Sequence, residues 1–275
     1  MKRQKEIKFD SVGYWSEVKL DIVKEYAAAY STILSNQKDP TFSHAYIDAF
    51  AGFGVHISRE TGEFILGSPL NALLVEPSFH DYYLIDIDSV KVATLKEIVG
   101  NRENVHIYEG NCNAILLNEI FPKVLFEHYR RGLCVLDPYG LHLNWQVIYT
   151  AGQMRSIDIF INFLVMDINR NVLWRNPDAV GPEAISRMDQ FWGDSSWRDM
   201  AYSTNQNLFG HPEKEDNITV AEAFRKRLKD DAGFEYVSEA LPMRNSRNAT
   251  VYYLLFASQK PVAFDIIKDI FKKYR

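Results

Sequence analysis

The sequence is poor in cysteine and contains no long hydrophobic run. Its 275 residues include only two cysteines, Cys112 and Cys134, which are too few for the disulfide framework of a small secreted protein. We therefore expect reduced thiols and a cytoplasmic location. No stretch approaches the roughly 18 consecutive apolar residues of a membrane span, and the basic stretch 1–10 precedes no apolar run. The sequence thus predicts neither a signal peptide nor a membrane anchor.

Signatures of several common enzyme classes are also absent. The seven histidines include no pair four residues apart and no cysteine partner at zinc-binding spacing, so we expect no metal site. The dinucleotide signature G-x-G-x-x-G needs a further glycine three residues after Gly54, where the chain has Ile57. Neither a G-x-S-x-G motif nor a Walker-type loop occurs. These absences argue against a nicotinamide dehydrogenase, a G-x-S-x-G hydrolase and a P-loop nucleotidase.

The net charge of −5 is unevenly distributed along the chain. Residues 1–220 hold 20 lysines and arginines against 29 acidic residues, whereas residues 221–275 hold 11 against 7. The acidic total argues against sequence-independent coating of nucleic acid but leaves room for a local basic surface. One basic cluster in a helical pattern has two interpretations, a solvated helix face or a phosphate contact: Arg225, Lys226, Arg227 and Lys229.

Apolar residues of the first half alternate between helical and strand patterns. A leading helix is predicted over 16–34, where apolar residues recur at helical spacing. Short apolar runs bounded by polar or glycine-bearing segments then indicate buried strands at 45–47, 82–85, 105–108, 133–136 and 157–161 with 163–164. Because helical stretches lie between most of these runs, the sequence predicts a largely parallel sheet with helices on both faces.

The second half departs from this simple alternation. Residues 169–229 are interpreted as helices and polar loops with three tryptophans, which is typical of an insertion or lid over one end of a sheet. Two more strands are predicted over 234–241 and 250–257, and the short turn-prone segment between them favours an antiparallel hairpin. A closing helix over 262–274 is expected to pack on the sheet. The chain is thus predicted to be one Rossmann-like α/β domain, whose mainly parallel seven-stranded sheet ends in an antiparallel hairpin and carries a helical insertion.

The most informative segment is a buried strand that leads into a glycine-bearing loop, residues 46–54. Gly52 and Gly54, close to Ala51, let the backbone approach a ligand without an intervening Cβ. Asp48 can accept hydrogen bonds from a ligand amine near the carboxyl end of its strand, where open α/β sheets bind their ligands. The alternative is that the glycines only make a tight turn.

A helix is predicted to begin close to this loop. After an excursion over 55–66, Ser68 is a suitable N-cap and Pro69 a suitable first helical residue. The free N–H groups at such a helix start are suited to a carboxylate of a ligand.

The next two predicted strands also end in polar side chains. Asp86 is placed to accept hydrogen bonds from the 2′- and 3′-hydroxyls of a ribose, with Ile87 covering one face of an adenine. Asp88 has the alternative role of capping the following helix. Asn111, with Cys112 beside it, can present its amide to an adenine, or it can be an ordinary turn residue.

The fourth strand runs into Asp137, Pro138 and Tyr139. A carboxylate, a rigid proline and an aromatic ring in this place can hold a planar amine between a proton acceptor and a stacking ring. The alternative is an ordinary turn that starts at the Asp-Pro pair. His142 is a second proton-acceptor candidate, or else a solvated loop histidine.

Taken in order, these motifs resemble those of class I S-adenosylmethionine-dependent methyltransferases. Over nearly its whole length the chain also resembles the three-Cys-motif partner protein family. The segments that carry this second resemblance are Trp15-Ser16 with Lys19-Leu20, 48–54, Gly67-Ser68-Pro69, 137–140, 191–194 and 252–258. The resemblance implies S-adenosylmethionine as the cofactor and a neighbouring protein with three cysteines as a partner.

The resemblance also implies a division of the chain and a set of site residues. Within a single methyltransferase-like domain, 1–275, it implies an N-terminal helical segment (1–40), an adenosine-binding core (41–168), a helical insertion (169–229) and a terminal hairpin and helix (230–275). Asp137 and Tyr139 would be catalytic. The cofactor would be bound by Asp48, Ala51, Gly52, Gly54, Ser68, Asp86, Ile87, Asn111 and Cys112.

Three functions are compatible with the sequence. The first is methyl transfer to a nitrogen or oxygen of a nucleic acid or protein partner, with Asp137 orienting or deprotonating the acceptor. The second is a non-catalytic partner module that binds the cofactor. It is supported by departures from the amino-methyltransferase motif, where Tyr139 replaces a second proline and Gly140 an aromatic, and by Asn111 in place of an aspartate. The third, a nucleic-acid adaptor, rests on the basic C-terminal part and the tryptophan-rich insertion.

Overall fold

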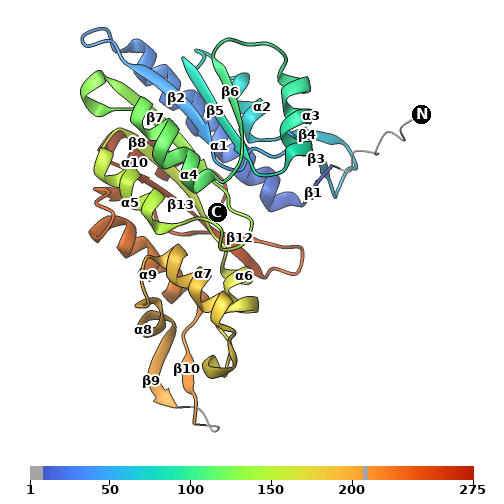
Figure 1. Cartoon of the computed structure of the whole chain (residues 1–275), viewed down its shortest axis with the longest axis vertical. Coiled ribbons are helices and arrows are strands. Elements are labelled where there is room, and N and C mark those ends of the chain that lie inside the picture. Colours follow the sequence, from blue (N-terminus) through green and yellow to red (C-terminus); the bar gives the residue numbers. More distant parts are fainter. Residues whose placement is uncertain (1–8, 207–209) are drawn as a thin grey trace.

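A computed structural model describes residues 9–206 and 210–275. Within these residues the centre is a sheet of eight strands in the order β11-β13-β8-β7-β2-β5-β6, with β12 also paired to β13 (Figure 1). The strands are β2 (Ser43–Asp48), β5 (Asp81–Asp86), β6 (Val105–Glu109), β7 (Arg130–Leu136), β8 (Ile157–Phe163), β11 (Tyr236–Val237), β12 (Leu241–Arg244) and β13 (Thr250–Ser258).

The pairing in this sheet is mainly parallel. Strands β6, β5, β2, β7 and β8 each run parallel to their neighbours. Strand β13 runs antiparallel to β8 and pairs antiparallel with both β11 and β12. The Rossmann-like α/β sheet predicted from the sequence is therefore confirmed.

The predicted number of strands is wrong, since the main sheet has eight among the described residues rather than seven. The segment 234–241, predicted as one strand, forms β11 and the start of β12. Between them, the Ser238 hydroxyl accepts a hydrogen bond of 2.9 Å from the backbone N–H of Phe256. The side chain thus takes the place of a backbone carbonyl in the ladder, and the strand is interrupted there. Strand β12 then continues to Arg244, past the predicted strand end.

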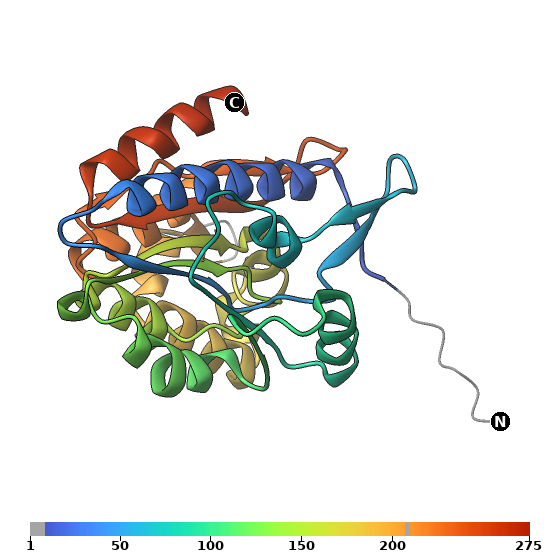
Figure 2. The same cartoon turned by 90° about the horizontal axis from the view of Figure 1, so that it is seen from above.

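Helices cover both faces of the sheet (Figure 2). One layer contains α1 (Tyr14–Asn36), α2 (Ser68–Leu73), α3 (Ser89–Val99) and α10 (Pro261–Lys273). The other contains α4 (Cys112–Ile115) with a π-helical turn (Leu116–Ile120), short 3₁₀ helices (Phe121–Lys123, Phe126–His128) and α5 (Trp145–Met154). Successive strand residues point to opposite faces, so Phe160 of β8 contacts the first layer and its neighbour Ile161 the second.

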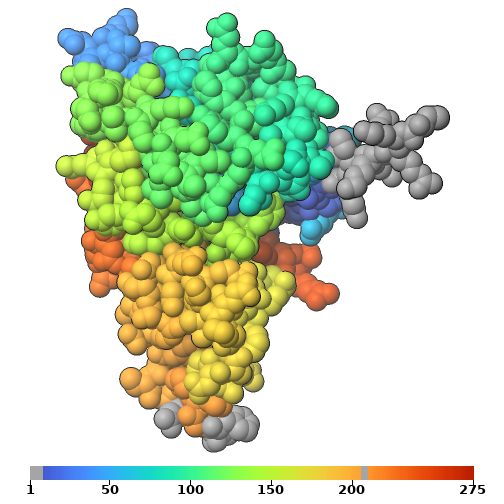
Figure 3. Space-filling model, viewed as in Figure 1, coloured from blue at the N-terminus to red at the C-terminus, as the bar shows by residue number. Residues whose placement is uncertain are grey.

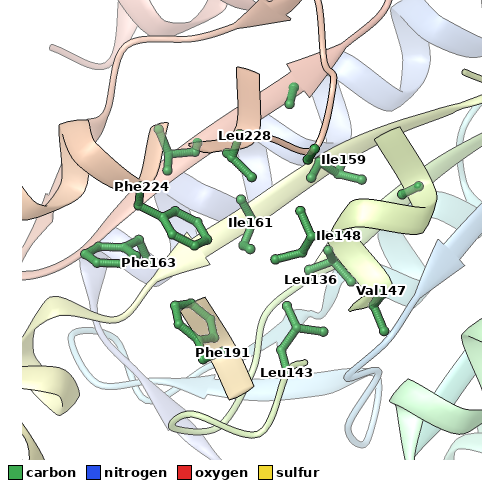
Figure 4. Close-up of a cluster of buried hydrophobic side chains, with 14 of the residues drawn as sticks. Leu136, Leu143, Val147, Ile148, Ile159, Ile161, Phe163, Phe191, Phe224 and Leu228 are labelled. Carbon is green, nitrogen blue, oxygen red and sulfur yellow. The ribbon is translucent and has the colours of Figure 1, made fainter. Parts of the chain in front are cut away.

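The larger of the two cores includes part of the predicted insertion. Phe224 lies 4.9 Å from Phe163 of β8 and 5.3 Å from Phe191, measured between ring centres (Figure 4). Phe191 belongs to α7 (Pro182–Trp192) and Phe224 to α9 (Asn217–Asp230), and all three rings are fully buried. These two helices therefore complete the core and are not a separable lid.

The remainder of the insertion is not wholly helical, which corrects the prediction for 169–229. Besides α6 (Val165–Asn171), a 3₁₀ turn (Pro177–Ala179) and α8 (Trp197–Ala201), it contains the antiparallel strands β9 (Tyr202–Gln206) and β10 (Pro212–Lys214). Serine, threonine and asparagine in β9 are weak helix formers, which favours an extended conformation there. The strand pair forms the tip that projects away from the sheet in Figures 1 and 3.

The predicted N-terminal helical segment, 1–40, also contains a strand. Strand β1 (Ser11–Val12) pairs parallel with β3 (Val55–Ser58), which pairs antiparallel with β4 (Phe64–Leu66). The basic residues Lys2, Arg3, Lys5 and Lys8 lie outside the described residues. Across residues 9–206 and 210–275, no helix is both long enough and apolar enough to cross a membrane. The cytoplasmic location stays a prediction.

His44 is a buried titratable residue at the amino end of β2, far from the loops that follow the strands. It is 1% exposed, and its Nε2 lies 2.7 Å from the Ser31 hydroxyl. Its Nδ1 lies 3.2 Å from Nδ1 of His80. Burial, with a smaller contribution from His80, lowers the pKa of His44 from 6.5 to about 4. The folded protein therefore holds this ring neutral.

We expect this histidine to make the fold acid-sensitive. Because the folded pKa lies below the unfolded one, its contribution is present in full above pH 6.5 and is lost as the pH falls towards 4. The loss between pH 7 and pH 5 is about 2 kcal/mol of unfolding free energy. Urea unfolding at both pH values checks this by comparing wild type with His44→Gln, since other titrating groups are common to both. Equal pH dependence in the two proteins would contradict the prediction.

Candidate functional site

The carboxyl ends of four parallel strands surround a cavity of about 410 Å³. Ligands of open α/β sheets bind at this edge. The residues that line it follow the strands in turn: Ala49 and Phe50 after β2, 86–88 at the end of β5 with Lys91 of α3, 110–112 after β6, and Tyr139 and His142 after β7. Five of the predicted site residues are among them: Asp86, Ile87, Asn111, Cys112 and Tyr139.

A larger cavity, of about 830 Å³, lies in the insertion. The residues that line it all fall within 172–212, and Trp197 and Tyr202 are the largest of them. It therefore receives none of the carboxylates and glycines that follow the parallel strands in the described chain. We place the candidate site at the smaller cavity, because polar side chains that follow three of the parallel strands, β5, β6 and β7, converge there.

The glycine loop after β2 adopts a conformation that its glycines make accessible. Gly52 and Gly54 have φ angles of 62° and 77°, in the left-handed region. A Cβ at Gly54 would also lie 2.7 Å from Cδ1 of Leu95. The N–H of Gly67 donates a 2.7 Å hydrogen bond to the Gly54 carbonyl, so the start of α2 lies against the loop, as predicted. The tight turn given as the alternative is therefore present, and the approach of a ligand to these glycines stays a prediction.

Asp86 is the best-anchored carboxylate in the cavity. It is 6% exposed, and its two oxygens accept hydrogen bonds of 2.9 Å from the backbone N–H groups of Gly52 and Asp88. Asp88 in turn caps α3 by accepting from the N–H of Val90, so its capping role is confirmed. Ile87 is 74% exposed on the cavity wall. A carboxylate fixed in this way can accept hydrogen bonds from a pair of ligand hydroxyls. The exposed aliphatic side chain beside it can pack on a flat ring of the same ligand.

Asn111 and Cys112 line the cavity after β6. Asn111 caps α4, because its side-chain oxygen accepts a 2.9 Å hydrogen bond from the N–H of Asn113, so the local role given as the alternative is present. Its NH₂ group can still donate to a ring nitrogen. Cys112 is 7% exposed, and burial raises the pKa of its thiol to about 12, so it is a neutral wall residue. Asn113 also donates to the His142 carbonyl at 2.9 Å and accepts from the Asn144 N–H at 2.8 Å. It therefore fixes the loop after β7 against the loop after β6.

Five predicted cofactor residues do not line the cavity: Asp48, Ala51, Gly52, Gly54 and Ser68. The predicted catalytic residue Asp137 does not line it either. Asp48 is fully buried, and it accepts hydrogen bonds from the Ser68 hydroxyl and from the Phe50 N–H at 3.1 Å. Burial raises the pKa of Asp48 to about 6. Ser68 is not the N-cap of α2, because Gly67 occupies that position and the Ser68 hydroxyl is engaged with Asp48. Ala51 is buried, with its N–H bonded to the Ile85 carbonyl at 2.8 Å.

Asp137 follows β7, and both of its carboxylate oxygens have partners. The Lys19 ammonium of α1 forms an ion pair with one oxygen, and the Asn162 side chain of β8 donates to the other. The Asp137 side chain is still 37% exposed, whereas that of Lys19 is 12% exposed. Asp137 is therefore held in place from two sides and reachable from a third.

The Tyr139 ring is covered on one face by a cation. The Lys91 ammonium lies 4.8 Å from the ring centre, donates to the Tyr139 hydroxyl at 3.2 Å and pairs with Asp10 at 2.8 Å. It also lies 5.3 Å from the Phe53 ring centre. Although burial lowers the pKa of Lys91, its bonds to Asp10 and Tyr139 outweigh this and raise it. The face towards Lys91 is thus unavailable for stacking a base, although Tyr139 remains 55% exposed.

Sequence reasoning missed four residues that build the site: Lys19, Lys91, Asn113 and Asn162. For Lys19 a signal was present. It shares a helix face with Val23 and Tyr26, four and seven residues later, so a charge interrupts the apolar stripe of α1. For the other three, local sequence carries no comparable signal, because their partners lie on other strand-end loops.

Strand β13 runs antiparallel next to β8 in an otherwise parallel row of strands, and the cavity of about 410 Å³ lies at the carboxyl ends of the parallel strands. These features define the fold as Rossmann-like, of the class I methyltransferase type. No protein-family model and no curated protein matches the chain.

Solved structures with this fold are similar at low sequence identity. Protein LPL1258 from Legionella pneumophila is 12% identical with a TM-score of 0.50, over 96% of this chain and 92% of that one. The methyltransferase domain of bacterial CtHen1 is 9% identical with a TM-score of 0.41, over 86% and 99%. The plantazolicin methyltransferase BamL is 12% identical with a TM-score of 0.36, over 89% and 91%. At such identities the likeness concerns the fold.

Proposed function

We propose that this protein binds S-adenosylmethionine in the 410 Å³ cavity and transfers its methyl group to a nitrogen or oxygen of a nucleic acid or protein partner. The observation that carries this proposal is that Asp86, Ile87 and Asn111, from the ends of two neighbouring strands, line one cavity beside the loop of Gly52 and Gly54, to which Asp86 is hydrogen-bonded. Asp137 follows a third strand, β7, at the same edge of the sheet. Bound cofactor supplies an electrophilic methyl group, and the protein supplies binding and orientation.

The cavity offers a complementary group for each part of an adenosine. The Asp86 carboxylate accepts hydrogen bonds from the ribose hydroxyls, Ile87 covers the adenine, and the Asn111 NH₂ group donates to a ring nitrogen. Left-handed backbone at Gly52 and Gly54 brings main-chain groups close to the ligand. The hydrogen bonds from Gly52 and Asp88 hold the Asp86 carboxylate before a ligand arrives, which lowers the entropic cost of binding.

The acceptor group would meet Asp137. Its exposed side can accept a hydrogen bond from an acceptor N–H or O–H, which orients a lone pair towards the methyl group. A second cavity, of about 310 Å³, shares Tyr139 and His142 with the first and is lined on its other side by Asp167 and Arg187. We propose this polar space as the approach for the acceptor. A three-cysteine-motif protein, implied by the family resemblance, is the proposed partner.

A non-catalytic cofactor-binding module is the second candidate function. It is favoured by the engagement of both Asp137 oxygens and of the Tyr139 hydroxyl by residues of the chain itself. In that case the cavity would bind the cofactor while the partner protein carries out the chemistry.

The basic helix lends little support to a nucleic-acid adaptor. Arg225 pairs with Glu222, and Arg227 pairs with Asp194 and Asp231. The Arg227 guanidinium also lies 4.9 Å from the Trp145 ring centre, and its side chain is 16% exposed. These contacts favour the interpretation of a helix face with internal ion pairs over that of a phosphate contact.

Calorimetric titration of the purified protein with S-adenosylmethionine and S-adenosylhomocysteine tests the premise shared by both candidates. We expect both ligands to bind at one site per chain, and NAD, the negative control, not to bind, because the third glycine of its signature is missing. Folded protein that binds neither adenosyl ligand would overturn the proposal.

A further inference from the structure

One charged side chain in the first helix layer lies on an otherwise apolar helix face. Lys19 lies on the face of α1 that packs on the sheet, among Val23, Tyr26 and other apolar residues. Its side chain is 12% exposed. An ammonium in such surroundings is costly unless it is paired, and a methionine of similar length would pack there without a partner. We therefore look for the role of Lys19 among the groups that its ammonium contacts.

That site is the end of β7. The Lys19 ammonium is paired with Asp137 and lies 5.6 Å from the Tyr252 ring centre on β13. On the other side, Asn162 of β8 donates to the remaining oxygen of Asp137. Val135 of β7 pairs with Asp48 at the end of β2, and Asp137 follows two residues later. The pair thus lies beside the ends of β2 and β7, at the carboxylate that the proposed function assigns to the acceptor group.

We propose that Lys19 is a positioning residue of the methyl-transfer centre, where its ammonium orients Asp137 and cancels the charge of that carboxylate next to the cofactor sulfur. This inference rests on the proposed function. The positive charge on the sulfur disappears as the methyl group leaves. A bare carboxylate nearby would stabilise the bound cofactor more than the transition state, and so would slow the transfer. The neutralised pair keeps Asp137 as a hydrogen-bond acceptor without that penalty.

The charge difference between two ligands tests this directly without knowledge of the acceptor. S-adenosylmethionine carries the positive sulfur and S-adenosylhomocysteine does not, so the ratio of their affinities reports the electrostatic potential at that atom. Calorimetric titrations give this ratio for wild type, Lys19→Met, Asp137→Asn and the double variant. Removal of one unit charge close to the sulfur changes the ratio on the order of tenfold.

The two single variants are expected to change the ratio of affinities in opposite directions. Lys19→Met raises the preference for S-adenosylmethionine about tenfold, and Asp137→Asn lowers it by a similar factor. The double variant returns close to the wild-type ratio, because both charges are removed together. Lys19→Arg, which keeps the charge, leaves the ratio unchanged. Each single variant predicts a change in the ratio by itself, so the other carries the test if one of them folds poorly.

Lys91 provides a matched control, since it is also an ion-paired lysine with a side chain only 14% exposed, next to the same cavity. Lys91→Met is expected to change the affinity for both ligands equally. A wild-type protein that binds neither ligand would overturn both this inference and the proposed function. Binding of both, with ratios within twofold of wild type in Lys19→Met and Asp137→Asn, would overturn the inference alone.

Discussion

Replacement of Asp86 by alanine is expected to weaken the binding of S-adenosylmethionine about a hundredfold. Asp86 would accept two hydrogen bonds from the ribose, and a hydrogen bond to a charged group contributes about 1.5 kcal/mol or more. Loss of two such bonds corresponds to roughly a hundredfold in the dissociation constant. S-adenosylhomocysteine should lose the same factor, because the ribose is common to both ligands. Calorimetric titration of both ligands measures the effect.

Two further variants separate recognition from folding. Asp81 lies at the opposite end of the same strand, where it pairs with Arg130 and His106, so Asp81→Ala should leave the affinity unchanged. Asp86→Asn removes the charge and keeps an acceptor for only one of the backbone N–H groups of Gly52 and Asp88, which bond to different oxygens of Asp86, and it should weaken binding to an intermediate degree. Wild-type affinity in a well-folded Asp86→Ala protein would show that the adenosine does not bind here.

Replacement of Asp137 by alanine is expected to lower methyl transfer at least a hundredfold with little change in the affinity for S-adenosylhomocysteine. A positioned group that accepts a hydrogen bond or proton from the acceptor contributes about 10²–10⁴-fold in rate. Transfer is measured with a labelled methyl group, using the purified protein together with candidate acceptors, among them the proposed three-cysteine partner. Persistent transfer would make the catalytic assignment wrong.

The single variant also leaves the Lys19 ammonium buried without its partner, which is expected to destabilise the fold. The double variant Lys19→Met with Asp137→Ala removes this charge and should recover thermal stability. If methyl transfer stays low while thermal stability returns, the loss of transfer is due to the missing Asp137 carboxylate and not to unfolding. Recovery of transfer together with stability would instead indicate a structural role for Asp137 and favour the non-catalytic function.

Local sequence was sufficient for the parallel strands and for much of the cavity wall. Short apolar runs bounded by polar segments identified the parallel strands, because a strand buried on both faces needs a continuous apolar stretch. Asp86 and Asn111 were found because they stand directly after such runs, and parallel strands bring their carboxyl ends to one edge. Glycine at positions 52 and 54 likewise permits the positive φ angles found there, because it has no Cβ.

Tertiary structure alone decided which partner each polar group took. Asp137 pairs with Lys19, 118 residues away. Ser68 donates to Asp48 and does not cap its own helix, although the local sequence predicted a cap. The split of the predicted strand at Ser238 depends on an N–H of β13 that is 18 residues distant. The sequence by itself therefore determined the parallel strands, the glycine loop and the carboxylates at the sheet edge, since these follow from burial and backbone freedom within a few residues. Packing decided the hydrogen-bond and ion-pair partners, because a buried polar group takes whichever complementary group the fold brings within reach.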